Sequence, residues 1–330
     1  MRALKKWRND MLIKPDFFDE FKCKASECKH TCCRGWEIDI DPISLSRYLN
    51  YEGKLGKKMK ESITFQDEEF CFKTDEEGRC PFLREDGLCE IIIEKGEDEL
   101  SDICALHPRF FFDYKDISYS GFGMACEVIS DKITSELVKD NISFILEDTE
   151  VDGNLTEKNI TLEEIHEYNK LRNEACGTAS FCFSFQDYIS SMGLFEEDSI
   201  YEIISDIEAI DEQWTEELNR IKNKSFDINE IKEDTPLMAA LNRIYQYIFF
   251  RSMGSCFDVE TEELDQDCYR GIDHFAAYNT ELIYLLYIAN KDVTGGYSLS
   301  DAARRWSAQI EYASETVQAL LKNVYMVKKK

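Results

Sequence analysis

The sequence predicts an α+β protein that is predominantly helical, with a cysteine-rich metal-binding N-terminal part and a helical C-terminal part. Three observations support this fold class. Nine of the 13 cysteines lie within the first 126 residues, where short alternating segments are separated by turn residues. From about residue 160 onward, apolar residues recur at helical spacing almost without interruption. Acidic residues are also concentrated in the second part, since residues 1–126 carry 20 basic and 26 acidic side chains and residues 127–330 carry 19 and 40.

We therefore expect two parts: a cysteine-rich iron–sulfur or other metal-binding region over 1–126, and a mainly helical domain over 127–330 packed against it. The 330 residues suffice for a large buried core. No segment rich in proline, glycine and serine separates the two parts, so a flexible linker is not expected.

The N-terminal part alternates short strands and helices. Trp36, Ile38 and Ile40 alternate with acidic residues, which predicts a half-buried strand over 36–41. Asp41 followed by Pro42 predicts the start of a helix. Further elements are strands at 63–73, 110–114 and 117–120, a short helix at 100–106, a turn at 121–123, and a helix from 127 to about 141.

The C-terminal part reads as a series of helices. The segments 161–175, 183–193 and 197–222 have acidic faces, with apolar residues at helical spacing. Ser298 and Asp301 form a capping box at the start of the last helix. The predicted helices cover 161–175, 183–193, 197–222, 236–253, 271–291 and 298–327.

Charge and hydropathy exclude several classes of protein. A net charge of −27 repels nucleic acid phosphates, so no nucleic acid partner is expected. No apolar run reaches the ~18 residues of a membrane span. The basic first ten residues are not followed by a long apolar stretch, so we expect no secretory signal and a cytoplasmic location.

The clustered cysteines predict a metal site. In a protein without a secretory signal, clustered cysteines more often bind metals or act in redox chemistry than form disulfides. Four thiolates suffice for a tetrahedral zinc ion or for a 4Fe–4S cluster, and the spacing leaves both open. Cys71 lies between two phenylalanines and is expected to be a buried apolar thiol. The predicted metal-associated residues are Cys23, Cys28, Cys32, Cys33, Cys80, Cys89, Cys104 and Cys126.

These cysteines carry a resemblance to a known family. The order Cys23-x4-Cys28-x3-Cys32-Cys33-x-Gly35-Trp36, Cys80-Pro81-Phe82-Leu83 with Cys89, Cys104-x2-His107-Pro108-Arg109, and Cys126-Glu127 resembles that of the flagellin lysine-N-methylase family, FliB. In the C-terminal half, Leu241-x3-Tyr245-x5-Arg251 and Arg305-Trp306-Ser307-x2-Ile310-Glu311-Tyr312 resemble two further segments of that family.

The resemblance implies transfer of a methyl group from S-adenosylmethionine to lysine side chains of flagellin, with a 4Fe–4S cluster bound by the family cysteines. Arg109 and Glu127 are then candidate cofactor contacts near the cluster. No residue stands out as the catalytic base.

Two other interpretations remain open at this point. A helical adaptor stabilised by zinc would have the same cysteines without catalysis. An iron–sulfur redox protein would have the cluster without methyl transfer.

Overall fold

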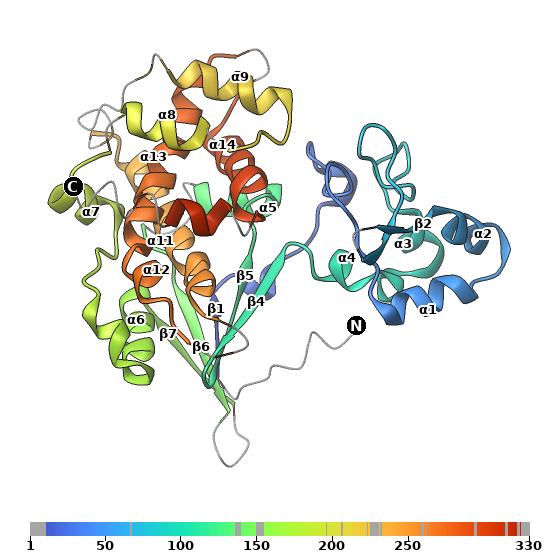
Figure 1. Ribbon diagram of the computed structural model, residues 1–330, viewed down its shortest axis with the longest axis horizontal. Coiled ribbons are helices and arrows are strands. Elements are labelled where there is room, and N and C mark those ends of the chain that lie inside the picture. The colour runs from blue at the N-terminus through green and yellow to red at the C-terminus, as the bar shows by residue number, and fades with distance from the viewer. Residues whose placement is uncertain are drawn as a thin grey trace. The chain divides into compact units, whose positions relative to one another are not determined.

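The computed structural model describes residues 11–66, 68–135, 140–149, 155–195, 197–205, 207–222, 224, 231, 233–258, 261, 263–293, 296–313, 316–321 and 324 (Figure 1). The described chain forms two compact units. Unit 1 comprises residues 22–110, and unit 2 comprises residues 11–21 together with residues 111–324. The sequence-based division at residue 126 rests on cysteine content and charge, and it stays a prediction.

Unit 1 is built from short elements around one small core. Its first helix follows the predicted start signal, because the Asp41 side chain accepts hydrogen bonds from the main-chain N–H groups of Ile43 and Ser44, and Pro42 is the first helical residue. The elements are a 3₁₀ turn at Ala25–Glu27, α1 (Pro42–Asn50), α2 (Gly53–Ser62), β2 (Ile63–Gln66), β3 (Glu69–Phe72), α3 (Glu90–Lys95), a 3₁₀ turn at Glu97–Glu99, and α4 (Asp102–Leu106).

Unit 2 contains a five-stranded sheet in the order β4-β5-β1-β6-β7. Strand β1 runs parallel to β5 and antiparallel to β6, and β6 pairs antiparallel with β7. The chain enters unit 2 within β4, between Phe110 and Phe111. The strands are β1 (Met11–Pro15), β4 (Arg109–Tyr114), β5 (Ile117–Phe122), β6 (Phe144–Thr149) and β7 (Leu155–Ile160).

Helices make up the rest of unit 2, and the two longest form its centre (Figure 1). Helices α11 (Thr235–Ser252) and α13 (Ile272–Asn290) bury nearly all their aromatic and aliphatic side chains, which form the core of unit 2. Cys256 and Cys268 form a disulfide beside them. The helices are α5 (Glu127–Thr134), α6 (Leu162–Arg172), α7 (Phe185–Met192), α8 (Glu197–Ser205), α9 (Glu212–Ile221), α11 (Thr235–Ser252), α12 (Gln266–Arg270), α13 (Ile272–Asn290) and α14 (Leu299–Trp306), which a π-helical turn extends over Ser307–Glu311.

The predicted class, α+β and mostly helical, is confirmed, with several changes in detail. The predicted strand over 63–73 is the β2–β3 hairpin, and the segment 197–222 is two helices, with residue 206 outside the described part. Residues 36–41 form no regular strand, although Ile38 and Ile40 are buried as their alternation predicted. Gly121, predicted in a turn, is a strand residue of β5.

Three helix and membrane predictions can also be compared with the structure. Helix α5 ends at Thr134, short of the predicted 141, and residues 136–139 lie outside the described part. The final predicted helix is α-helical to Trp306, continues as the π-helical turn, and is α-helical again at residues 316–321 and 324, whereas residues 314–315, 322–323 and 325–327 are outside the described part. Residues 1–10, on which the absence of a secretory signal was judged, are outside it as well. Within the described residues, no helix combines the length and apolar character needed to cross a membrane.

Candidate metal centre

Four of the predicted metal-associated cysteines lie around a single hydrophobic cluster in unit 1. Cys80 is a buried member of that cluster, only 8% exposed, and Cys33, Cys89 and Cys104 are half-buried against it. These residues are far apart in the sequence, so the fold rather than local spacing brings their thiols to one core. The apolar members of the cluster are Ile38, Ile40, Tyr48, Leu55, Met59, Phe72, Phe82 and Ile91.

The main chain joins Cys33 directly to Cys80. The amide of Cys80 donates a 2.9 Å hydrogen bond to the carbonyl oxygen of Cys33, and the amide of Gly35 donates a 2.9 Å bond to the carbonyl of Gly78. The turn that leads into Cys80 is shaped by Asp75, whose carboxylate accepts bonds from the amides of residues 77 and 79. Gly78 occupies the left-handed region at φ +71°, where glycine is favoured.

Cys80 and Cys89 stand at the two ends of a second tight turn. The amide of Leu83 donates to the carbonyl of Cys80 at 3.1 Å, and the amide of Glu90 donates to the carbonyl of Phe82 at 2.8 Å. Cys89 immediately precedes α3. The sequence Cys-Pro-Phe-Leu with a later cysteine therefore forms a tight turn that carries one thiol at each end.

Cys104 is carried by α4, which is tied to α1. The Asp41 carboxylate that caps α1 also accepts a 2.9 Å hydrogen bond from the amide of Asp102 at the start of α4. The Tyr48 hydroxyl of α1 donates to the carbonyl of Glu99, just before α4, at 2.8 Å. These contacts fix α4 against the core on which the other three thiols lie.

The four thiols act on one another electrostatically. Burial, together with negative charge on Cys33, Cys104 and Cys89, raises the pKa of Cys80 to about 12. Burial likewise raises the pKa of Cys104 to about 11 and raises that of Cys89, and Cys33 contributes to both shifts. Cys33 differs, because a hydrogen bond with the Cys32 thiol lowers its pKa to about 7. One thiol of the group is therefore readily ionised, whereas the other three are neutral until something compensates their charge.

The chemistry of this donor set fits a thiophilic metal centre. Thiolate sulfur is the preferred ligand of structural zinc and of iron–sulfur clusters, and both take four cysteines. Among the described residues, no group of three or more Cys, His, Asp or Glu side chains is already arranged to hold a metal ion. The structure thus brings four suitable donors to one core without showing a finished coordination site.

The other predicted cysteines occupy different surroundings. Cys23 and Cys32 are exposed and Cys28 is half-exposed, all on the irregular segment that precedes the core of unit 1. The Cys23 sulfur accepts a 3.3 Å hydrogen bond from the amide of Ala25. Cys126 belongs to unit 2, where it immediately precedes α5. Cys71 is 2% exposed, which confirms the prediction of a buried thiol.

The two predicted cofactor contacts belong to different units. Arg109 is the first residue of β4 and is assigned to unit 1, whereas Glu127 is a buried residue in the first turn of α5 in unit 2. Their roles stay predictions. His107, two residues before Arg109, packs its ring against Trp36 with centroids 5.6 Å apart. Burial lowers the pKa of His107 to about 4, so its imidazole is neutral near pH 7.

A polar centre in unit 2 was not predicted as a site. Glu311 accepts a 3.0 Å hydrogen bond from the amide of Met124 and pairs with the guanidinium of Arg251 at 3.1 Å. Arg251 also lies over the ring of Tyr312, 5.9 Å from its centroid. Arg251 and Glu311 come from the two C-terminal segments that carried the family resemblance, and the structure brings these segments into contact. The resemblance was the only sequence signal for this pair, because nothing in the local pattern marks either residue.

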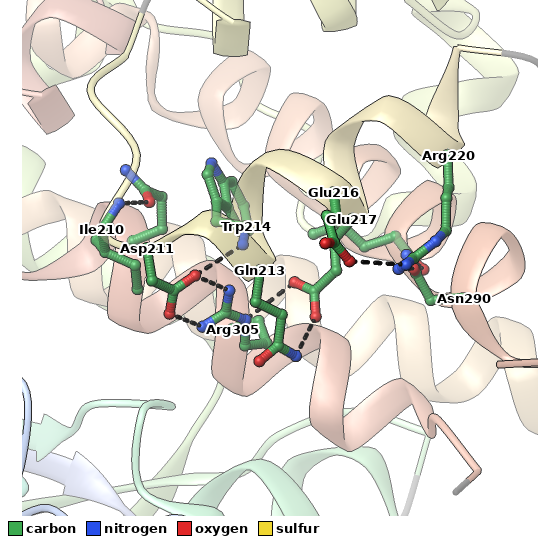
Figure 2. A network of polar contacts seen from close by, with 11 residues as sticks. Ile210, Asp211, Gln213, Trp214, Glu216, Glu217, Arg220, Asn290 and Arg305 are labelled. Carbon is green, nitrogen blue, oxygen red and sulfur yellow. Dashed lines mark hydrogen bonds and ion pairs between the residues drawn. The ribbon is translucent and has the colours of Figure 1, made fainter. Parts of the chain in front are cut away.

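A second buried network surrounds Arg305 (Figure 2). Its guanidinium donates to both carboxylate oxygens of Asp211, at 2.8 and 2.9 Å, and to Glu217 at 2.9 Å. The side chains of Arg305 and Glu217 are 6% and 2% exposed. Because Arg305 joins α14 to α9 and to the residue that caps α9, we assign it a structural role in unit 2.

Comparison with known proteins finds similarity over part of the chain. The chain is 28% identical over 136 residues to the proteins named Lysine-N-methylase of Salmonella typhimurium and Salmonella choleraesuis. The match covers 38% of this chain and 33% of each relative. The chain is also 28% identical over 136 residues to the flagellar biosynthetic protein FliU of Salmonella muenchen, and this match covers 78% of FliU. The match thus spans about a third of the length of the lysine-N-methylases. No family model and no solved structure matches the chain.

Proposed function

We propose that the chain is a protein-lysine N-methyltransferase that acts on flagellin, takes its methyl group from S-adenosylmethionine and uses an iron–sulfur cluster held by its N-terminal cysteines. The observation that carries this proposal is the convergence of Cys33, Cys80, Cys89 and Cys104 on one core of unit 1. The names of the similar Salmonella proteins support lysine N-methylation as the reaction class and a link to the flagellum.

The charge of the protein is compatible with this substrate. Lysine side chains have a reference pKa of about 10.4 and are cationic near pH 7. A net charge of −27 attracts a lysine-bearing protein at long range. Only the neutral amine has a free lone pair, so the enzyme must remove the proton before transfer.

The transfer itself is a displacement at carbon. The amine nitrogen forms a bond to the methyl carbon while the carbon–sulfur bond of the sulfonium breaks, and S-adenosylhomocysteine leaves. One proton of the original ammonium group passes to a base or to solvent. A bound iron–sulfur cluster would supply iron able to bind the amino and carboxylate groups of the methyl donor. Carboxylates such as that of Glu127 are suited to a cationic sulfonium.

The direct test is methyl transfer from isotopically labelled S-adenosylmethionine to purified flagellin, followed by mass spectrometry of its lysine residues. We expect label on lysine with the anaerobically purified protein and a large loss of label with the Cys80→Ser variant. Cys71→Ser is the matched control, because Cys71 is a buried thiol of the same unit outside the four-cysteine group. Unlabelled flagellin with a protein that contains both iron and sulfide would contradict the proposal.

One observation also favours a second function. A zinc-stabilised adaptor without catalysis would likewise gather four thiols at the core of a small unit. A colourless protein with bound zinc, no labile sulfide and no binding of S-adenosylmethionine would support this alternative.

A further inference from the structure

Two phenylalanines are exposed at the end of the β2–β3 hairpin in unit 1. Phe65 of β2 is 62% exposed and Phe70 of β3 is 40% exposed, and the centroids of their rings lie 4.9 Å apart. The two residues are directly opposite in the antiparallel register, so both side chains lie on the same face of the hairpin. Aromatic side chains gain much stability from burial, and a pair left in solvent is typical of an interaction surface.

This pair ends an apolar row that begins in the core of unit 1. Ile40 is a buried member of the hydrophobic cluster, and its amide donates a 2.7 Å hydrogen bond to the carbonyl oxygen of Phe70. Asp39 and Cys71 form an antiparallel bridge, which puts the next residue, Ile40, opposite Phe70. The row therefore crosses the sheet from a buried isoleucine to Phe65 at its rim.

Strand β2 forms an open edge of this sheet. Within the described residues, β2 pairs with β3 alone, whereas Phe70 and Phe72 of β3 also bond the segment 38–40 on the other side. In an antiparallel ladder the residues opposite them, Ile63 and Phe65, then direct their main-chain groups to the open side. Edge strands are usually guarded by lysine, proline or a bulge, and the sequence Ile-Thr-Phe-Gln of β2 has none of these.

The opposite face of the same sheet is acidic. Residues 36–41 and 63–72 together contain six acidic and no basic side chains. Glu69 is exposed and points to the face opposite the phenylalanine pair. The exposed Glu37 accepts a 3.7 Å hydrogen bond from the thiol of Cys71 on that same face. The edge thus offers apolar contacts on one face and negative charge on the other.

We propose that the open edge of β2 docks an extended, lysine-bearing protein segment, which adds to the hairpin as a further strand. Successive side chains of a strand point to opposite faces, so apolar residues of the segment cover Phe65 while alternate lysines lie on the acidic face. A second copy of this chain fits less well, because two acidic faces would meet. The docking surface stands on its own, and only the identification of the segment with flagellin rests on the proposed function.

The test measures binding to the full chain by fluorescence anisotropy, without S-adenosylmethionine. The probes are labelled flagellin and two short synthetic peptides, one alternating valine with lysine and the other alternating valine with glutamate. We expect flagellin and the lysine peptide to bind and the glutamate peptide not to bind. Binding of the lysine peptide without flagellin would support the docking surface and contradict flagellin as its partner.

Three substitutions test the surface itself. Phe65→Ala removes the exposed ring and should weaken binding of the lysine peptide by about tenfold. Phe65→Pro removes the outward N–H group as well and should weaken binding further, since proline is tolerated at such an edge position. Ile43→Ala is the matched control, because Ile43 is 70% exposed on α1 of the same unit, and it should bind as the wild type does. Thermal melting checks that each variant is folded.

Three results would overturn the inference. The first is that folded Phe65→Ala binds the lysine peptide as tightly as the wild type. The second is that the wild type binds the lysine and glutamate peptides equally. The third is a wild-type dimer that Phe65→Ala dissociates, which would make the β2 edge an interface between copies of this chain.

Steady-state kinetics separate this inference from the proposed function. If both hold, Phe65→Ala raises KM for flagellin and leaves kcat unchanged, because the lost contact is made equally in the ground state and the transition state. Methyl transfer to flagellin with an unchanged KM supports the enzyme and contradicts the docking surface. Binding of the lysine peptide through Phe65 without methyl transfer to flagellin supports the docking surface and contradicts the enzyme.

Discussion

The amide of Cys80 donates a 2.9 Å hydrogen bond to the carbonyl oxygen of Cys33, and these two residues are 47 positions apart in the sequence. The bond joins the cysteine-rich opening segment to the Cys-Pro-Phe-Leu turn and places both thiols against the same apolar core. Backbone pairing of this kind fixes the spacing of two candidate ligands, which the proposed metal centre would require.

Gly56 in α2 should resist replacement by alanine, although alanine is the better helix former. A Cβ atom at Gly56 would lie 2.3 Å from the carbonyl oxygen of Tyr51, a backbone atom that cannot swing aside. The gain in helix propensity is about 1 kcal/mol, and we expect the clash to outweigh it, so that Gly56→Ala lowers the free energy of unfolding by about 1–3 kcal/mol. Urea unfolding measures this change.

Lys54→Ala is the control for that prediction, because Lys54 is exposed on the same helix. Its free energy of unfolding should change by no more than about 0.5 kcal/mol. A Gly56→Ala variant more stable than the wild type would show that α2 can move away from Tyr51.

The elements that the sequence predicted correctly are those with strong local signals. Asp41 and Pro42 mark the start of α1, and Ser298 with Asp301 forms the predicted capping box. The long helices α11 and α13 were also found, because so many of their residues are apolar that burial on all sides follows. In these cases the information lies within a few residues of the element itself.

Three strands of the sheet were missed because their signals are not local. The residues of β7 are almost all exposed and polar, and β1 and β6 are defined mainly by pairing with each other, as between Leu12 and Glu147. A strand that is polar on both faces lacks the alternation of apolar and polar residues that marks a half-buried strand, and the pairing partner of a strand can be over one hundred residues away.

The candidate site shows the same contrast between features that the sequence reveals directly and features that depend on tertiary packing. The sequence identified the thiols because cysteine clustering is a compositional signal. It could not separate the four cysteines on the core of unit 1 from the exposed cysteines, since adjacent Cys32 and Cys33 have different burial. The contact of Arg251 with Glu311 also depends on tertiary packing between two distant helical segments.

Removal of the Glu311 side chain should destabilise unit 2 strongly. The side chain is 3% exposed, and its loss leaves the amide of Met124 and the guanidinium of Arg251 without this acceptor. We expect Glu311→Ala to lower the free energy of unfolding by about 3 kcal/mol. Glu311→Gln keeps an acceptor oxygen and should lower the free energy of unfolding by less than Glu311→Ala. The exposed pair of Glu216 and Arg220 is the comparison, and Glu216→Ala should cost less than about 1 kcal/mol.

Asp273 should make stability fall as the pH rises from about 4 to about 7. Burial raises the pKa of this carboxyl group from 3.8 to about 7, so the folded protein holds a proton that the unfolded chain releases. The stability it contributes is complete below the unfolded pKa and is lost as the pH passes through the folded value. Urea unfolding at several pH values measures the slope. The titratable groups that interact with it are Cys182, Tyr188, Tyr245 and His274.

The isosteric variant Asp273→Asn isolates this effect. Its side-chain oxygen can still accept the 2.9 Å hydrogen bond from the amide of His274, but it does not titrate. We expect the variant to have a flatter dependence of stability on pH in this range. His274→Gln removes the neighbouring titration as a control. Equal slopes for the wild type and Asp273→Asn would show that another group is responsible.

The network around Arg305 predicts coupling between the substitutions Arg305→Met and Glu217→Gln. The double variant should lose less free energy of unfolding than the sum of the losses in the two single variants. Arg305→Met would leave the Glu217 carboxylate, 2% exposed, as a buried charge that keeps only the 2.8 Å hydrogen bond from Gln213 among the contacts in Figure 2. Breaking a buried ion pair in this way costs about 3–5 kcal/mol, mostly because the remaining charge is uncompensated. Glu217→Gln removes that charge and keeps an acceptor for Gln213.

The double variant Arg305→Met with Glu217→Gln should therefore recover much of the stability that Arg305→Met loses. Asp211 stays unchanged in all variants, because its carboxylate is partly exposed and also caps α9 through the amide of Trp214. A double-mutant cycle from urea unfolding gives the coupling, which we expect to be at least about 1 kcal/mol. Strictly additive losses would mean that the Glu217 charge is satisfied without Arg305. In that case the methionine substitution would destabilise unit 2 through the loss of the Arg305 guanidinium from the face of Trp214, whose ring centroid lies 5.9 Å from the guanidinium carbon.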